Sequence, residues 1–94
     1  GPQAQLSIAA FSSPAAARQA YTRYQAYITS PSNMAIGARP AVLHGVGDSA
    51  VAVKSRISGQ IVAALKGRYL IVVRRAKDPA AAQNLAKAAL NRAH

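Results

Sequence analysis

The segment His-Gly-Val-Gly-Asp-Ser, residues 44–49, brings together three side chains used in nucleophilic catalysis. In a catalytic interpretation His44 is the base, Asp48 orients it and Ser49 is the nucleophile. Such a triad also needs a fixed geometry and an oxyanion hole in a cleft. A chain of 94 residues has little material for a cleft. We therefore expect a structural role, in which Asp48 caps a turn.

Other catalytic and metal-binding patterns are weak. Gly45 and Gly47 resemble part of a phosphate-binding loop, but no helix follows and the Gly-Lys-Ser/Thr ending is missing. The chain has two histidines far apart, two carboxylates and no cysteine. This composition argues against a metal site and excludes disulfides, thiolate ligands and cysteine nucleophiles. A paired-carboxylate hydrolase could use only Asp48 and Asp78. We expect no enzyme activity, no metal and no cofactor.

The charge balance is the most unusual property of the chain. Twelve lysines and arginines face two acidic residues, which gives a net charge of +10. Such a field attracts nucleic acid, acidic lipid surfaces, anionic cell-wall polymer or an acidic protein. The alternative is a basic surface that only aids solubility. The predicted contact residues for an anionic partner are Lys54, Arg56, Lys66, Arg68, Arg74, Arg75 and Lys77. They lie near the ends of predicted strands and predict basic rims, not a continuous stripe.

Two helices are predicted from similar starting signals. Ser13 is a suitable N-cap and Pro14 a suitable first residue for a helix over 14–28. Asp78 and Pro79 begin the second helix in the same way, and the aspartate also favours the positive end of the helix dipole. The expected apolar stripes are Ala17, Tyr21, Tyr24 and Ile28 in the first helix, and Leu85, Ala86, Ala89 and Leu90 in the second.

The strands are predicted from alternation and from apolar runs. Residues 5–11 alternate in polarity and predict a strand. Residues 29–40 read as a loop with a short strand near 34–36, and strand segments follow at 41–43 and 50–53. The last strands form a hairpin, 60–65 and 68–73, joined by Lys66-Gly67 with a positive φ at the glycine. Because residues 70–73 are all apolar, this strand should be central in its sheet.

These elements predict one α+β domain over residues 1–94. We expect an antiparallel sheet of three to five strands with two helices on one face, in the order β-α-(β)-β-β-β-α. Gly1-Pro2 looks like the remnant of tag cleavage, so a signal peptide or anchor could have been removed. No apolar run of about 18 residues is present, and we predict no transmembrane helix.

The stretch Leu-Ser-Ile-Ala-Ala-Phe-Ser-Ser-Pro-Ala-Ala-Ala-Arg-Gln-Ala resembles the first βα unit of sporulation-related (SPOR) repeat domains. The matching positions are Leu6, Ile8, Phe11, Ser12, Ala16, Ala17 and Arg18. The resemblance implies binding of peptidoglycan glycan strands in a bacterial envelope. The chain departs from the family at Val73-Arg74-Arg75, where a Gly-Pro-Phe-like strand end is usual.

Residues 45–92 are similar in pattern to small α+β domains of bacterial envelope lipoproteins and sensor ectodomains. The shared features are Gly-x-Gly-Asp-x-Ala, a strand, a hairpin with Lys/Arg-Gly at its tip and a closing Ala/Leu helix. They correspond here to Gly45, Gly47, Asp48, Ala50, Lys66, Gly67 and the segment 85–90. This resemblance implies a non-catalytic role outside the cytoplasm, in the periplasm or at the cell surface.

The sequence therefore favours a non-catalytic, extracytoplasmic binding module of a bacterial envelope protein, whose basic surface meets a cell-wall polymer or an acidic protein. The alternative is a cytoplasmic or phage nucleic-acid-binding domain that uses the same basic residues. A third hypothesis is a self-assembling structural subunit, because an edge strand could pair between copies. In that hypothesis the edge is Ala-Val-Ala-Val-Lys, residues 50–54, where only Lys54 opposes pairing.

Overall fold

The computed structural model describes residues 4–92 and has two helices and five strands. The elements are β1 (Gln5–Ala10), α1 (Pro14–Ile28), β2 (Ala41–Val42), β3 (Ser49–Ser55), β4 (Gly59–Lys66), β5 (Tyr69–Ala76) and α2 (Pro79–Arg92). The α+β class, the antiparallel sheet and the order β-α-β-β-β-β-α are as predicted. Gly1, Pro2 and His94 lie outside the described residues.

The five strands form one antiparallel sheet in the order β1-β5-β4-β3-β2. β4 is the central strand, and β5 is also interior because it lies between β4 and β1. The apolar run at residues 70–73 therefore indicated an interior strand correctly. This strand, β5, lies next to the central strand and not at the centre itself. The two edges are β1, with six residues, and β2, with two.

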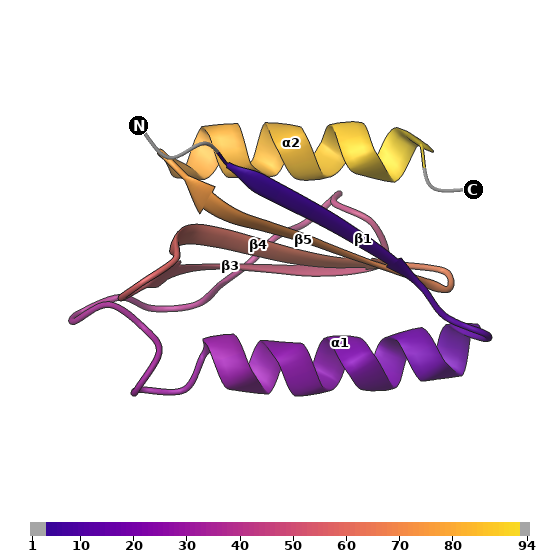
Figure 1. Ribbon diagram of the computed structural model, residues 1–94, viewed down its shortest axis with the longest axis horizontal. Helices are drawn as coiled ribbons and strands as arrows, with labels where there is room; N and C mark the ends of the chain where they lie inside the picture. The colour runs from indigo at the N-terminus through magenta and orange to yellow at the C-terminus, as the bar shows by residue number, and fades with distance from the viewer. Residues whose placement is uncertain (1–3, 93–94) are drawn as a thin grey trace.

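The prediction that both helices cover one face of the sheet is wrong. The sheet lies between α1 and α2, which cover opposite faces (Figure 1). Alternate residues of the interior strands divide between them: Val51 and Ile61 pack with α1, whereas Ala50 and Ile71 pack with α2. Strands that are apolar on both faces need a cover on each face, since either face left in water would cost hydrophobic free energy.

Both predicted helix starts are confirmed. The Ser13 hydroxyl accepts a hydrogen bond from the Ala16 N–H at 3.1 Å, and the Asp78 carboxylate accepts one from the Ala81 N–H at 2.7 Å. The buried residues of α1 are Ala17, Tyr21 and Ile28; those of α2 are Ala82, Ala86, Ala89 and Leu90. Tyr24 and Leu85 are half-buried. Neither helix is long and apolar enough to cross a membrane within residues 4–92.

The strand boundaries differ from the predictions between residues 34 and 68. The expected strand near 34–36 is a single bridge between Met34 and Ser55. The β4–β5 connection is Gly67-Arg68, one residue later than predicted, although Gly67 has the expected positive φ of 56°.

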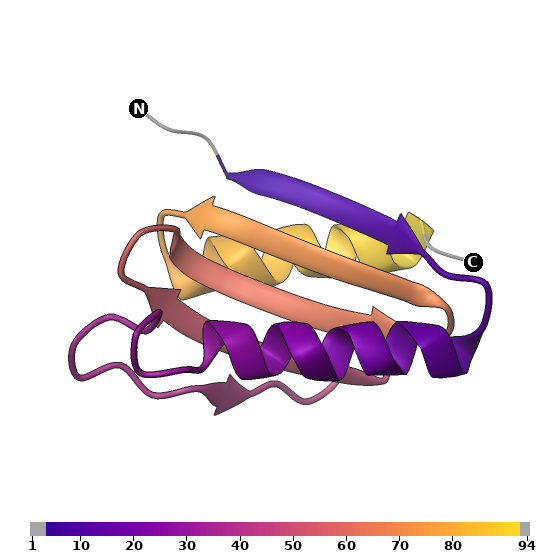
Figure 2. The same ribbon diagram turned by 60° about the horizontal axis from the view of Figure 1, so that its bottom comes forward.

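The segment 50–54 is not an open edge, so the predicted route to self-assembly is absent there. The Leu43 N–H donates to the Ala50 carbonyl at 3.0 Å, and the Ala35 N–H donates to the Lys54 carbonyl at 2.8 Å. Together with β2, these bonds cover the outer side of β3. Figure 2 shows that the long free edge of the sheet is β1 instead.

Candidate functional site

The seven predicted contact residues divide between the two ends of the sheet. Five of them form what we call the basic end: Lys54, Arg56, Arg74, Arg75 and Lys77. Their backbone positions share one end of the sheet because the β3–β4 turn lies against the end of β5. Ser55 pairs with Gly59, and the Arg75 N–H donates to the Ser58 carbonyl at 2.7 Å. Lys66 and Arg68 lie at the opposite end, at the β4–β5 turn.

The two cations at the β4–β5 turn have contacts within the fold. The Lys66 ammonium donates to the Leu90 carbonyl at 2.9 Å and so satisfies a carbonyl in the last turn of α2. The Arg68 guanidinium lies 5.5 Å from the centre of the Tyr69 ring, within cation–π range. These contacts give Lys66 and Arg68 structural roles that are independent of any ligand.

The basic end contains a β-bulge in β5. Val62 pairs with Val73, but Gln60 pairs with Ala76, so β5 has one more residue than β4 in this interval. Two residues of β5, Arg74 and Arg75, therefore lie opposite one residue of β4, Ile61. Arg75 has a φ of 60° and is the only residue other than glycine with a positive φ in the described chain, residues 4–92. The left-handed region disfavours side chains with a Cβ, and bulges of this kind usually contain glycine there.

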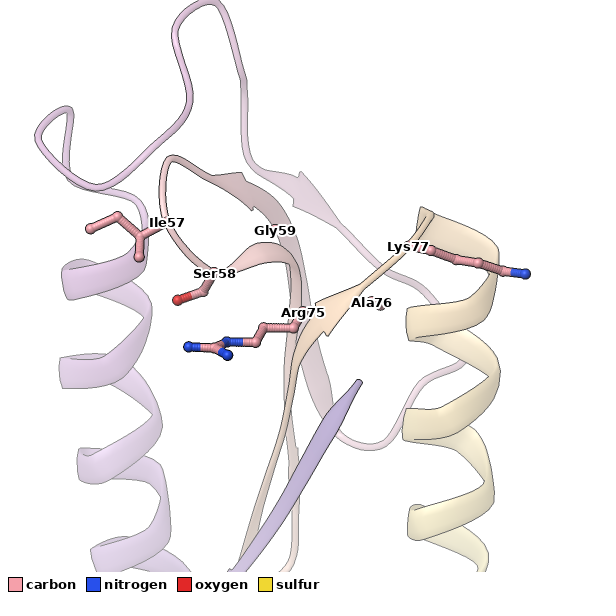
Figure 3. Close-up of a pocket in the computed structure, with 6 residues that line it drawn as sticks. All are labelled: Ile57, Ser58, Gly59, Arg75, Ala76 and Lys77. Carbon is pink, nitrogen blue, oxygen red and sulfur yellow. The ribbon is translucent and has the colours of Figure 1, made fainter. Parts of the chain in front are cut away.

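The bulge changes which face of the sheet the side chains occupy. Arg74 lies on the α1 face, where it lines a cavity with Tyr24 and Tyr27. Val73 and Ala76 are both buried on the α2 face against Ala82 and Ala86, although they are three positions apart in β5. In a regular strand, neighbouring side chains on one face are two positions apart. In Figure 3, Arg75 points to the α1 side next to Ser58, while Lys77 points the opposite way across the start of α2. The extra residue thus places two consecutive arginines on one face.

Two adjoining cavities lie beside these arginines. The shallow one measures about 580 Å³ and is lined by Ile57, Ser58, Gly59, Arg75, Ala76 and Lys77 (Figure 3). The more enclosed one measures about 200 Å³ and lies between the C-terminal half of α1 and the β3–β4 turn. Its lining includes Arg74, Asn33 and Ser55, and it shares Ile57 and Ser58 with the first. Guanidinium, hydroxyl and amide groups therefore surround an apolar space.

Aromatic side chains accompany the cations at the α1 side of the site. Burial raises the pKa of the Tyr24 hydroxyl, and the positive charge of Arg74 acts in the opposite direction. The Tyr24 and Tyr27 rings are 6.4 Å apart at 37°. Tyr27 is 63% exposed, so its ring is available to a ligand at the same place as the Arg74 charge.

Both carboxylates of the chain are occupied by backbone amides. Asp78 caps α2, and Asp48 accepts a hydrogen bond from the Gly67 N–H at 2.8 Å. Asp48 therefore stabilises the β4–β5 turn, which follows the strand next to β3. The sequence had predicted that it would cap a turn in its own segment. His44, Asp48 and Ser49 line a shallow cavity of about 290 Å³. Among residues 4–92, no group of three His, Cys, Asp or Glu side chains is placed to hold a metal ion.

Comparison with known proteins adds no relative. No protein-family model matches the chain, and no match is found among curated proteins or solved structures. The resemblances to SPOR domains and to envelope lipoprotein domains therefore stay predictions.

Replacing Arg75 with glycine tests the backbone at the bulge. We expect Arg75→Gly to stabilise the fold by about 1 kcal/mol, because glycine adopts a positive φ without the Cβ clash. Arg75→Ala is the matched control, since it removes the same charge but keeps the unfavourable φ. The measurement is the midpoint of urea unfolding of each variant. The midpoints report stability if the slope of the unfolding free energy against urea concentration is the same in both variants. Equal midpoints for the glycine and alanine variants would contradict a left-handed Arg75.

Proposed function

We propose that this protein is a non-catalytic binding module that holds an anionic partner at the basic end of its sheet. The observation that carries the proposal is the bulge, which brings Arg74 and Arg75 onto the same face beside two cavities. A guanidinium binds a carboxylate or phosphate through two parallel N–H donors, and such charge-assisted bonds are stronger than neutral ones. Two adjacent guanidinium groups suit successive acidic groups on a polymer or on an acidic protein segment.

The apolar lining supports a partner that is more than a simple ion. Ile57 is 86% exposed at the rim and belongs to both cavities. A partner with acidic groups next to apolar or ring surfaces would cover Ile57 and the Tyr27 ring while it pairs with the arginines. An anionic cell-wall polymer and an acidic peptide both have this character. We propose the bacterial envelope as the compartment on the strength of the two sequence resemblances.

Nucleic acid is the second candidate, and the exposure of Tyr27 favours it. Single-stranded nucleic acid binds where bases stack on aromatic rings beside positive charges. Tyr27 and Arg74 line one cavity and provide both features. A single exposed ring offers a small stacking platform, so we rank this candidate after an acidic polymer or protein.

The experiment compares three anionic ligands over a salt series. The ligands are purified peptidoglycan, polyglutamate and short single- or double-stranded oligonucleotides, each titrated into the protein. We expect peptidoglycan or polyglutamate to bind and to compete away any oligonucleotide. Tight oligonucleotide binding that neither competitor displaces, with a log–log salt slope of about −0.7 per contacted phosphate of a single strand, would establish nucleic acid instead. Failure of all three ligands to bind at physiological salt would overturn the proposal.

A further inference from the structure

The free edge strand β1 is unusual for an edge of this length. All six residues of β1 are exposed, including Leu6 at 37% and Ile8 at 48%. Edge strands are normally protected by charges, proline, bulges or short length. β1 has none of these features: its sequence is Gln-Leu-Ser-Ile-Ala-Ala, and it pairs with β5 without interruption. The opposite edge, β2, is protected by having only two residues.

Within residues 4–92, the backbone groups of β1 that have no strand partner are identified by its pairing with β5. The Phe11 N–H donates to the Arg68 carbonyl at 2.8 Å, so residue 11 points its backbone groups toward β5. Backbone direction alternates along a strand, and Gln5, Ser7 and Ala9 therefore also face β5. The N–H and C=O groups of the even residues, Leu6 and Ile8 among them, point away from the sheet. These groups form a row along β1, the strand that Figure 2 shows at the edge of the sheet.

The side chains of the same even residues lie on the α2 face. Leu6 pairs with Val73 and Ile8 pairs with Ile71, and both partners pack toward α2. An added strand would thus satisfy the outward backbone groups and cover the two exposed aliphatic side chains together.

The charge distribution favours a second copy of the chain as that strand. The first charged residue is Arg18, so β1 and the start of α1 are neutral in a chain of net charge +10. Two copies repel each other, and they can meet best where neither carries a cation. An acidic segment gains nothing from this neutral edge and is drawn to the basic end instead.

We propose that β1 pairs antiparallel with β1 of a second copy about a two-fold axis at Ser7. This register places the outward groups of Leu6 opposite those of the partner's Ile8, and it pairs every residue from 4 to 10. The product is a continuous sheet with five strands from each copy. A two-fold interface of this kind is self-complementary and closed, so it gives dimers and not fibres. The proposal is independent of the anion-binding site.

The first test is sedimentation equilibrium over a protein concentration series at low and high salt. We expect a monomer–dimer equilibrium that strengthens with salt, because salt screens the repulsion between two +10 chains. Ile8→Lys should weaken the dimer at least about tenfold by placing like charges in the interface. Val42→Lys is the matched control: Val42 is an exposed aliphatic residue, 68% accessible, on the other edge strand. The dissociation constant of the Val42→Lys dimer should equal that of the unchanged chain.

The second test reads the register directly and does not depend on how Ile8→Lys folds. The chain has no cysteine, so single cysteines can be placed without background. In the proposed register the two Ser7 residues form a pair without hydrogen bonds, with Cα atoms about 4.5 Å apart. Ser7→Cys should form an intermolecular disulfide under mild oxidation. Ala9→Cys, on the same face of the same strand, should not, because its two copies are well separated along the strands.

Three outcomes would overturn the proposal. The first is a chain that stays monomeric up to about millimolar concentration at high salt. The second is equal weakening by Ile8→Lys and Val42→Lys, which would indicate a general charge effect. The third is equal disulfide formation by Ser7→Cys and Ala9→Cys, which would indicate random collision.

Discussion

Ile71→Ala is expected to destabilise the fold by about 2–5 kcal/mol, the range for truncating a fully buried aliphatic residue. Ile71 is completely buried, and it packs with Ala64, Ala89 and Leu90 between β4 and α2. Ala64 and Ala89 have no flexible side chains with which to fill the space, so we expect much of the cavity to persist. A small domain has a total stability of about 5–15 kcal/mol, and this one change would remove a large part of it.

The measurement is urea unfolding followed by far-UV circular dichroism, with Ile36→Ala as the control. Ile36 is 93% exposed, so its truncation should change the free energy of unfolding by less than about 0.5 kcal/mol. Ile71→Val provides a milder step of about 0.5–1.5 kcal/mol in case the alanine variant does not fold. An Ile71→Ala effect as small as that of Ile36→Ala would contradict the position of α2 on this face.

Reversing the charge of the bulge is expected to weaken binding of the anionic partner about a hundredfold. The change is Arg74→Glu with Arg75→Glu. Each lost charge-assisted hydrogen bond costs about 1.5–3 kcal/mol, and each 1.4 kcal/mol is about a tenfold change in affinity. The measurement is the dissociation constant for the ligand that binds best in the salt series.

The matched control is Arg18→Glu with Arg23→Glu on the exposed side of α1. Both double variants have a net charge of +6, since each reversal lowers the +10 of the chain by two. The control therefore changes the overall field equally but leaves the bulge intact. Equal losses in the two variants would show that only net charge matters. Arg74→Lys with Arg75→Lys separates the charge from the planar guanidinium, and we expect a smaller but clear loss.

The candidate site was only partly predictable from the sequence. The sequence placed cations at strand ends and separated Lys66 and Arg68 from Arg74, Arg75 and Lys77, and the structure has the same division. The bulge was not predicted, because Leu-Ile-Val-Val-Arg-Arg is compatible with a regular strand. The direction of Arg75 toward α1 was missed for the same reason, since in a regular strand Arg75 would lie on the α2 face with Val73. The position of Arg74 beside Tyr24 and Tyr27 was missed because it depends on how α1 packs on the sheet.

β1 shows a similar limit. The alternation of Leu6 and Ile8 with polar residues indicated a strand correctly, but alternation normally implies one buried face. In the structure both residues are exposed, because β1 is at the edge of the sheet and the helices pack mainly over the strands farther in. Whether a strand is at an edge depends on how the other strands are ordered.

The sequence by itself determined the class of the fold, the order of its elements and both helix starts. Those features depend on residues a few positions apart, such as Ser13 with Ala16 or Asp78 with Ala81. The tertiary structure decided that the helices cover opposite faces, that β1 is the free edge and that Arg74 and Arg75 share one side. All three depend on contacts between segments distant in the chain: the faces on which the helices pack, the order of the strands, and the pairing register of β4 and β5. A shift of one residue moves side chains to the other face without changing the local pattern of the sequence.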